Sequence, residues 1–394
     1  MAIGRAKPKG QAQIAMINDV CIIGGGAAGL AAAAALDKNI KVCILEKNEI
    51  LGRKIAATGG GRCNLTNDAC EQKGVSLDFF ASLGLETTCD EEGRYYPYSE
   101  RAADVVEILT EALGSNVKIE LGFRVAEVEQ IIRSGEAGEG ELFVIRGMQK
   151  QEEREIVARR VIMAAGGKAA PQFGTTGDGY SILKRLGHEI TRLYPILTSI
   201  ECEEDFSPVK GIRAKAKVSL KKDGISITEE ERGEVQFTDK GLSGICIFNL
   251  TPHMKIEKGE SPAEGIRRFS VKVDLAPDFT AEQIAGRRDS FGIITRRLAD
   301  FVSHRGSIKE LEFPVKAIGG WREAQCTAGG VLISEVNMET MESNIRKGLY
   351  VAGEILDVQG PCGGYNLQNA WETGIKAARA INENLARVCG GKDK

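Results

Sequence analysis

The feature that most restricts the fold is a turn made only of glycine and alanine, residues 24–29. A short apolar run, Asp19–Ile23, precedes it and predicts a buried strand. An alanine-rich stretch to about Lys38 predicts a helix, and Lys41–Leu45 predicts a second strand that ends at Glu46. Strand, turn, helix and strand in this order form a βαβ unit, which requires a parallel sheet with helices on its faces.

Three glycines of this turn, Gly24, Gly26 and Gly29, have the spacing GxGxxG. The first permits the tight turn, the second lets a pyrophosphate approach the backbone, and the third lets helix and strand pack closely. Glu46 lies 22 residues after Gly24, where a carboxylate can bind the hydroxyls of an adenosine ribose. The unit predicts an adenine dinucleotide site and leaves FAD and NAD open; the alternative is a structural turn.

The loop after Glu46 carries Arg53 and Lys54 and then the run Thr58–Asn67, which contains three consecutive glycines. Cations and exposed backbone amides suit a second contact with a pyrophosphate, and polar groups suit a ribityl chain. An extended flavin dinucleotide needs such a loop, whereas NAD does not. A flexible solvated loop is the alternative that the residues alone leave open.

Two further strands end in small residues. Val161–Gly167 and Gly348–Glu354 each run from apolar side chains into glycine, and the second ends in an acid. A helix predicted over Asn366–Val388 follows. An acid at this place can bind ribityl hydroxyls, and a helix N-terminus can stabilise negative charge on a flavin ring.

The domain organisation follows from a change of pattern after residue 189. We expect an α/β, doubly wound, Rossmann-like domain with a parallel sheet, formed by residues 18–189 and 331–390 and interrupted by a β-rich and helical substrate domain, 190–330. Residues 1–17 are expected to be a flexible tail, and 281–303 to be helical. Short strands are predicted at 212–220, 233–237 and 268–274.

Composition narrows the location and the partners. The 394 residues hold 52 Lys and Arg against 55 Asp and Glu, a net charge of −3, which predicts no nucleic-acid partner. No apolar stretch approaches the ~20 residues of a membrane span. The ten cysteines show no CxxC pair, and no secretory leader is expected because no continuous apolar core follows the basic residues near the N-terminus, which predicts reduced thiols in a cytoplasmic protein. With three histidines, none paired with a cysteine at ligand spacing, no metal site is expected.

In these motifs the sequence resembles the BaiN/YhiN-like family of FAD-dependent oxidoreductases. The most specific matching segments are GGGRCNLTN, residues 59–67, and GGYNLQNAW, residues 363–371, and the resemblance runs from about residue 20 to 380. It implies an FAD domain interrupted by a β-rich domain and a small helical subdomain.

The resemblance also implies a set of FAD contacts, carried over by motif. They are Gly24, Gly26, Gly29, Glu46, Lys47, Arg53, Lys54, Gly60, Gly61, Arg62, Asn64, Leu65, Thr66, Val125, Ala165, Gly166, Gly353, Glu354, Asn366 and Leu367. Two positions depart from the family pattern: Asp239 stands where a histidine is frequent, and Ile245 where a proline is frequent.

The expected activity is hydride transfer between flavin and a small organic substrate, such as reduction of an activated C=C bond with NAD(P)H as a transient donor. A second GxGxxG for a nicotinamide cofactor is absent. The alternatives are an FAD-dependent amine oxidase that uses oxygen and a flavin-binding regulatory or RNA-associated protein. The catalytic residue stays open; the candidates for proton transfer are Arg62, Tyr96, Tyr98, Asp239, Lys240 and Tyr365.

Overall fold

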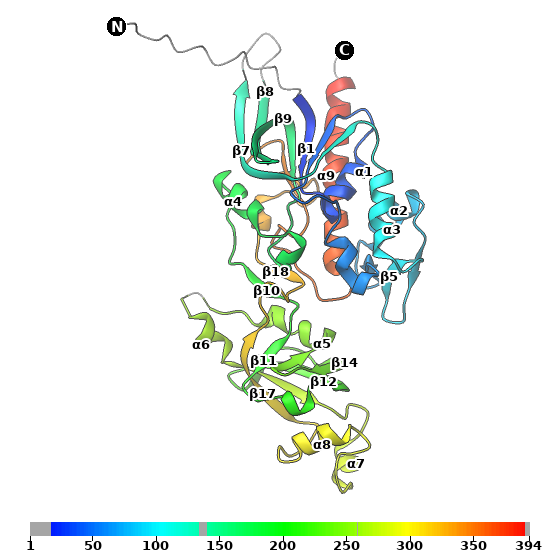
Figure 1. The fold of residues 1–394 in the computed structure, drawn as a ribbon, viewed down its shortest axis with the longest axis vertical. Helices are drawn as coiled ribbons and strands as arrows, with labels where there is room; N and C mark the ends of the chain where they lie inside the picture. Colours follow the sequence, from blue (N-terminus) through cyan, green and yellow to red (C-terminus); the bar gives the residue numbers. More distant parts are fainter. Residues whose placement is uncertain (1–16, 134–139, 258, 391–394) are drawn as a thin grey trace, which may run out of the picture.

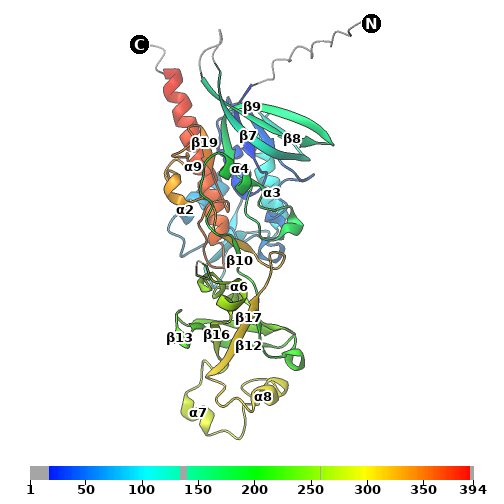
Figure 2. The same cartoon turned by 90° about the vertical axis from the view of Figure 1, so that its left-hand side faces the viewer.

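A computed structural model describes residues 17–133, 140–257 and 259–390. Two parts lie end to end along the long axis of the molecule, joined by β10 and β18 (Figures 1 and 2). The tail predicted over residues 1–17 lies outside the described residues, except Ile17, which begins the first strand.

The first part is built on a mixed seven-stranded sheet. Its strands are β1 (Ile17–Ile23), β2 (Val42–Leu45), β6 (Val117–Glu120), β7 (Phe123–Arg133), β8 (Gly140–Gln149), β9 (Glu152–Met163) and β19 (Leu349–Val351). The order is β6-β2-β1-β9-β8-β7, and β19 pairs with β9. The prediction of a parallel sheet holds for β6, β2, β1, β9 and β19, whereas β7, β8 and β9 form an antiparallel meander. Their short connections allow only antiparallel pairing, because a parallel crossover needs a dozen or more residues.

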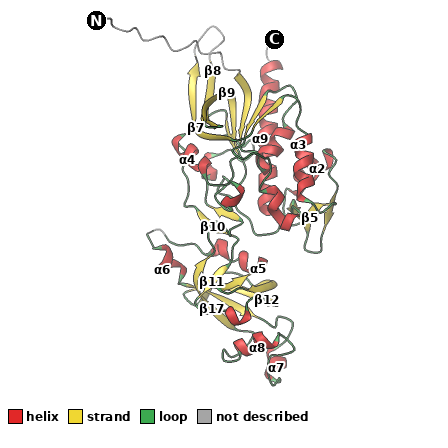
Figure 3. Ribbon diagram, viewed as in Figure 1, coloured by secondary structure: helices red, strands yellow, loops and turns green. Residues whose placement is uncertain are grey.

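Helices cover this sheet in two layers (Figure 3). They are α1 (Ala27–Ala35), α2 (Lys73–Ser82), α3 (Ala102–Glu111), α4 (Asp178–Arg185) and α9 (Tyr365–Gly390). One face of α1 packs Ala28 and Ala32 into the sheet core, and the other packs Leu30 and Ala31 against α3 and Trp371 of α9. The helix ends at Ala35, shorter than the predicted end near Lys38.

A small three-stranded sheet completes the first part. Its strands are β3 (Thr66–Asn67), β4 (Thr87–Cys89) and β5 (Arg94–Pro97), in the order β3-β5-β4. The indole nitrogen of Trp371 donates to the carbonyl of Leu65 at 3.1 Å, which ties this sheet to α9. The irregular segment η1 (Ile55–Gly61) lies between β2 and β3.

The second part is a closed antiparallel barrel. Its strands are β11 (Ile200–Cys202), β12 (Arg213–Lys222), β14 (Glu231–Phe237), β15 (Gly241–Ser243), β16 (Phe269–Asp274) and β17 (Leu311–Ile318), with β13 (Ile225–Ser226) added on β12. Pairing of β12 with β16 closes the barrel, and its core includes Phe206, Phe237 and Phe313. Its short helices are α5 (Ile245–Phe248), α6 (Pro262–Ile266), α7 (Ala281–Ala285) and α8 (Arg296–Val302). The prediction of a helix over 281–303 is wrong at its centre, because glycines 286 and 292 interrupt it.

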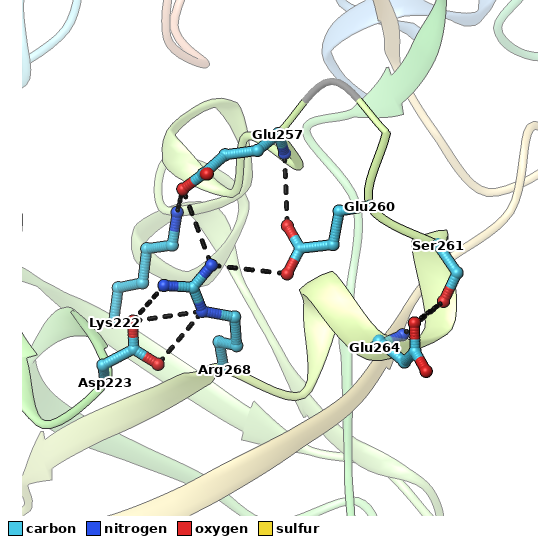
Figure 4. A network of polar contacts seen from close by, with 7 residues as sticks. All are labelled: Lys222, Asp223, Glu257, Glu260, Ser261, Glu264 and Arg268. Carbon is cyan, nitrogen blue, oxygen red and sulfur yellow. Dashed lines mark hydrogen bonds and ion pairs between the residues drawn. The ribbon is translucent and has the colours of Figure 1, made fainter.

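An ion-pair network fastens the segment before α6 to the barrel (Figure 4). The guanidinium of Arg268 pairs with Asp223 beyond the end of β12 and with Glu260, and the Lys222 ammonium pairs with Glu257 at 2.8 Å. These exposed pairs hold one loop in place and contribute little each to overall stability.

The two parts are joined by one small ladder. β10 (Tyr194–Ile196) pairs antiparallel with β18 (Cys326–Ala328), so the chain enters and leaves the barrel side by side. The barrel strands span 200–318, and a division of the chain near residues 190 and 330 stays our proposal. Within the described residues, no helix is long and apolar enough to cross a membrane.

Candidate functional site

A cavity of about 600 Å³ lies at the carboxyl ends of β1, β2, β9 and β19 and extends to the barrel entrance. Its volume is within the usual range for cofactor sites, and its place is the one where open α/β sheets bind ligands. Most of the residues predicted from the motifs line it: Gly24, Gly26, Glu46, Lys47, Arg53, Lys54, Gly60, Arg62, Asn64, Val125, Ala165, Gly166, Gly353, Glu354, Asn366 and Leu367. The predicted residues Gly29, Gly61, Leu65 and Thr66 are not part of its lining.

The glycine turn has the geometry that the spacing predicted. Gly24 has a φ of +108°, and a Cβ there would lie 2.3 Å from the carbonyl oxygen of Ala164. A Cβ on Gly26 would meet no protein atom within 4 Å, so this residue faces open space in the cavity wall. Gly29 lies behind the turn, where a Cβ would be 1.9 Å from the Gly24 carbonyl oxygen. It therefore packs helix against turn and does not face the cavity.

Glu46 is buried at the end of β2 and fixes both neighbouring loops. One carboxylate oxygen accepts from the Gly25 amide at 2.8 Å, and the other accepts from the backbone and side-chain nitrogens of Asn48 at 2.8 and 2.7 Å. The carboxylate thus holds the glycine turn in place, and the ribose contact expected from the sequence stays a prediction.

Lys54 and Glu354 meet across the cavity although 300 residues separate them. Lys54 Nζ lies 2.7 Å from Glu354 Oε2, and Glu354 Oε1 accepts from the Thr327 amide at 2.9 Å. Burial by itself would lower the pKa of Lys54, but the attraction of Glu354 outweighs it and the pKa is raised. Lys54 therefore stays a cation, and its charge is held in one place.

Lys47 is paired in a similar way. Its ammonium lies 3.0 Å from Asp178 and 2.7 Å from the hydroxyl of Thr176. Burial would raise the pKa of Asp178, yet the hydrogen bond and charge of Lys47 lower it. In contrast, the cavity-lining Arg53, Arg62 and Arg322 have no carboxylate within ion-pair distance among the described residues, so their charges are available to an anionic ligand.

The loop between η1 and β3 brings Asn64 to the cavity wall. Gly59, Gly60 and Gly61 all have left-handed φ, of 56°, 67° and 90°. They turn the chain so that Asn64, which is 8% exposed, lines the cavity. Its Oδ1 is buried against Gly364 and has no hydrogen-bond partner in the described structure. Leu65 and Thr66 are fully buried in the layer behind it.

The loop before α9 closes the cavity on another side. The side-chain amide of Asn366 accepts from the Gly360 amide at 2.9 Å and donates to the Gly360 carbonyl at 3.0 Å. It thereby fixes the glycines Gly363 and Gly364, which have φ of 117° and 104° and line the cavity at the start of α9. Asn366 acts here as a support for the loop, and the helix N-terminus supplies the positive end of a dipole.

The cavity extends to the barrel with residues that were not among the predicted contacts. Its lining there includes Leu197, Ile245, Cys326 and Cys362 and the loop 322–325. Leu197 and Cys326 lie at the two connections to the barrel, Ile245 begins α5, and Cys362 lies in the loop before α9, so these residues meet only in the folded chain. Burial raises the pKa of the Cys362 thiol to about 12 and that of Cys326 further, so both are neutral.

The structure separates the candidates for proton transfer. Tyr96 and Arg62 line the cavity, and the Arg62 guanidinium lies 4.5 Å from the centre of the Tyr96 ring. Tyr98 is 75% exposed, and Asp239 is exposed and paired with Lys210 at 3.2 Å. The cavity lining does not include Tyr98, Asp239, Lys240 or Tyr365.

These observations were compared with known proteins. A family model described as the HI0933-like protein Rossmann domain matches residues 18–77 and 72–380. The chain belongs to this family. The resemblance drawn from the motifs is thereby confirmed, and the chain is an FAD-dependent oxidoreductase with a Rossmann-like fold.

Two relatives match nearly the whole chain. A 3-dehydro-bile acid delta(4,6)-reductase of Clostridium scindens is 35% identical, over 93% of this chain and all of its own. A ribosomal RNA dihydrouridine synthase of Haemophilus influenzae is 28% identical, over 92% of this chain and 98% of its own. Among solved structures, the open conformation of a flavocytochrome c3 fumarate reductase is a distant likeness, with a TM-score of 0.49 at 15% identity over 94% of this chain and 78% of its own.

Proposed function

We propose that FAD occupies this cavity with its adenosine end beside Glu46 and Val125 and its flavin ring toward the barrel. Gly24, Gly26 and the first amides of α1 would hold the pyrophosphate, with Arg53 as the neutralising cation. The open space at Gly26, where an added Cβ would meet no protein atom within 4 Å, supports this placement, since it lets a pyrophosphate approach the backbone. The other cavity-lining residues predicted from the motifs, with Lys54 and Glu354 fixed as an ion pair, would complete the contacts.

We further propose that the substrate is a small, largely apolar molecule with a C=C bond conjugated to a carbonyl. The carrying observation is the 35% identity, over 93% of the chain, with a bile-acid delta(4,6)-reductase. The name of the second relative denotes the same kind of step, since dihydrouridine is uridine with its conjugated C=C bond saturated. The apolar side chains Leu197 and Ile245 at the barrel side of the cavity suit an apolar substrate. Bound FAD would supply hydride transfer, and the chain's residues would bind and orient the substrate beside it.

NAD(P)H is proposed as the electron donor. The sequence has no second GxGxxG, so a nicotinamide would enter through the open substrate side and leave again after reducing the flavin. Protein loaded with FAD and mixed anaerobically with NADH or NADPH should lose its visible flavin absorption with at least one of them. Absorption that persists with both would refute this donor.

A second candidate is reduction of uridine in RNA, favoured by the 28% identity with the ribosomal RNA enzyme. Several cations on the barrel strands are paired, which weakens this candidate: Arg213 with Glu234 at 3.1 Å, and Lys217 with Glu230 at 3.2 Å. Paired cations release few counterions and add little affinity for a phosphate backbone.

One experiment separates the substrate classes. FAD-loaded protein is reduced anaerobically with dithionite and then mixed with a 3-keto-Δ4 steroid acid, with uridine-containing ribosomal RNA, or with a primary amine and oxygen after reoxidation. The proposal predicts that the steroid enone reoxidises the flavin and gains two hydrogens. Reoxidation by RNA alone would favour the second candidate, and amine-dependent hydrogen peroxide would show an oxidase.

A further inference from the structure

The cavity contains one protic side chain whose surroundings suit proton transfer to carbon. Tyr96 on β5 is 3% exposed and lines the cavity. No described residue forms a hydrogen bond with its hydroxyl, yet this oxygen is not among the buried atoms without partners. The hydroxyl therefore reaches the small exposed area of the side chain and is free to meet a ligand.

The strand geometry explains this orientation. Alternate residues of a strand point to opposite faces, so Arg94 and Tyr96 share one face and Tyr95 lies on the other. Arg94 and Tyr96 both line the cavity. Tyr95 points away, and its hydroxyl donates to Asp68 at 3.0 Å. The chain thus holds two adjacent tyrosines, one facing the cavity and one occupied elsewhere.

Two guanidinium groups surround Tyr96. Arg62 lies over its ring at 4.5 Å, and Arg94 shares its face of the strand. Burial raises the pKa of Tyr96, the charges of Arg94 and Arg62 lower it, and the carboxylates of Asp90 and Glu92, which pair with Arg94, raise it. The phenol is therefore protonated at neutral pH, and the cations would stabilise the anion that remains after it gives up its proton.

The two thiols of the cavity are less suited. The Cys362 thiol donates to the side-chain oxygen of Gln325 at 3.6 Å, so its proton is already engaged. Burial and the neighbouring Glu354 carboxylate raise the pKa of Cys326. Loss of a proton from Cys326 would place a thiolate beside that carboxylate, which is unfavourable.

We propose that the Tyr96 hydroxyl is the catalytic proton donor in the reduction of a conjugated C=C bond, and that Arg62 is a positioning residue that stabilises its anion. This inference rests on the proposed function. Bound reduced FAD would supply hydride, so that a C–H bond forms at the β-carbon of the substrate while the π electrons move to the carbonyl oxygen. The O–H bond of Tyr96 then breaks, a C–H bond forms at the α-carbon, and the tyrosinate regains a proton from water.

The test uses two probes that differ in their need for an acid. An enone needs a proton at the α-carbon, whereas a nitroalkene gives a nitro-stabilised carbanion that can leave and be protonated in water. In single turnovers of the reduced, FAD-loaded protein, Tyr96→Phe should slow enone reduction about 10²- to 10⁴-fold. It should leave nitroalkene reduction within a few-fold of wild type, and Tyr95→Phe should change neither rate.

The outcomes are distinguishable. Enone reduction at the wild-type rate by Tyr96→Phe, or an equal loss with both probes, would overturn the assignment of Tyr96. Failure of the wild-type protein to reduce either probe would instead refute the proposed function, on which this inference depends.

A second readout needs no turnover. In protein labelled with ¹³C at the tyrosine Cζ, the resonance missing from Tyr96→Phe identifies Tyr96, and its shift with pH reports the pKa of the phenol. Arg62→Gln should raise that pKa, because one of the cations that favour the tyrosinate is removed. A Tyr96 titration unchanged by Arg62→Gln would contradict the role given to Arg62.

Discussion

Replacement of Gly29 by alanine tests the architecture of the cofactor site most sharply. A Cβ at this position would lie 1.9 Å from the Gly24 carbonyl oxygen, whereas real Cβ contacts are essentially never below 3.0 Å. The glycine turn or helix α1 must therefore retreat by about 1 Å, and both are backbone. Overpacking of this kind costs about 1–3 kcal/mol of unfolding free energy.

The same displacement moves the amides that would hold the pyrophosphate. Loss of one hydrogen bond to a charged group costs about 1.5–3 kcal/mol, which corresponds to a roughly 10- to 150-fold weaker affinity. We expect Gly29→Ala to lower both the melting temperature of the apoprotein and its affinity for FAD, the latter measured by quenching of flavin fluorescence.

Two other glycines serve as matched controls. An added Cβ at Gly26 or at Gly74 meets no protein atom within 4 Å. Gly26→Ala should keep the stability of the apoprotein but weaken FAD binding, because its methyl group enters the cavity. Gly74→Ala, in exposed helix α2, should keep FAD binding and add about 0.5–1 kcal/mol of stability. A Gly29→Ala protein with the stability and FAD affinity of wild type would refute the packing described for the turn.

Two further predictions concern buried polar pairs. Lys54→Met leaves the carboxylate of Glu354 without its cation and should cost about 1–3 kcal/mol of unfolding free energy, whereas adding Glu354→Gln should recover part of that loss. Urea unfolding of the two single variants and the double variant measures the coupling. Costs that simply add would disprove it. His188 is fully buried between Glu335 and Ser343, each at 3.0 Å, and burial lowers its pKa. Below about pH 6.5 His188 is protonated more readily in the unfolded state than in the folded state. Its contribution to the free energy of unfolding should therefore be fully present above that pH and be lost as the pH drops toward the pKa of the folded state. His188→Gln should flatten this acid limb, and a limb of unchanged size would contradict the role of His188.

The residues that the sequence predicted well belong to contiguous units. The strand, turn and helix around Gly24, Gly26 and Gly29 are local, and the spacing itself dictates which glycine faces the ligand and which packs inside. Glu46 was expected to bind a ribose, and its hydrogen bonds to Gly25 and Asn48 were not foreseen because they depend on loop geometry.

The rest of the site could not be predicted because it is assembled from distant segments. Leu197, Ile245 and Cys362 have no pattern that marks them as neighbours, and only the closure of the barrel and the β10–β18 ladder brings them to one cavity. Lys54 and Glu354 were each predicted as FAD contacts, but the ion pair between them was not predicted because they lie far apart in the sequence.

The sheet was predicted only in part for a related reason. Apolar runs mark the strands but carry no information on direction, and the meander of β7, β8 and β9 pairs antiparallel because its connections are short. The prediction of one helix over 281–303 was wrong at its centre, because it gave the helical pattern more weight than the glycines that separate α7 from α8.

The most direct test of the account is one anaerobic single-turnover experiment. The purified protein is saturated with FAD, reduced with one equivalent of dithionite, and mixed with a 3-keto-Δ4 steroid acid while its visible absorption is recorded. The proposed enone reduction predicts that one FAD per chain is retained, that the flavin absorption returns, and that one equivalent of saturated ketone forms. Protein that retains no flavin, or reduced flavin that only oxygen reoxidises, would contradict it.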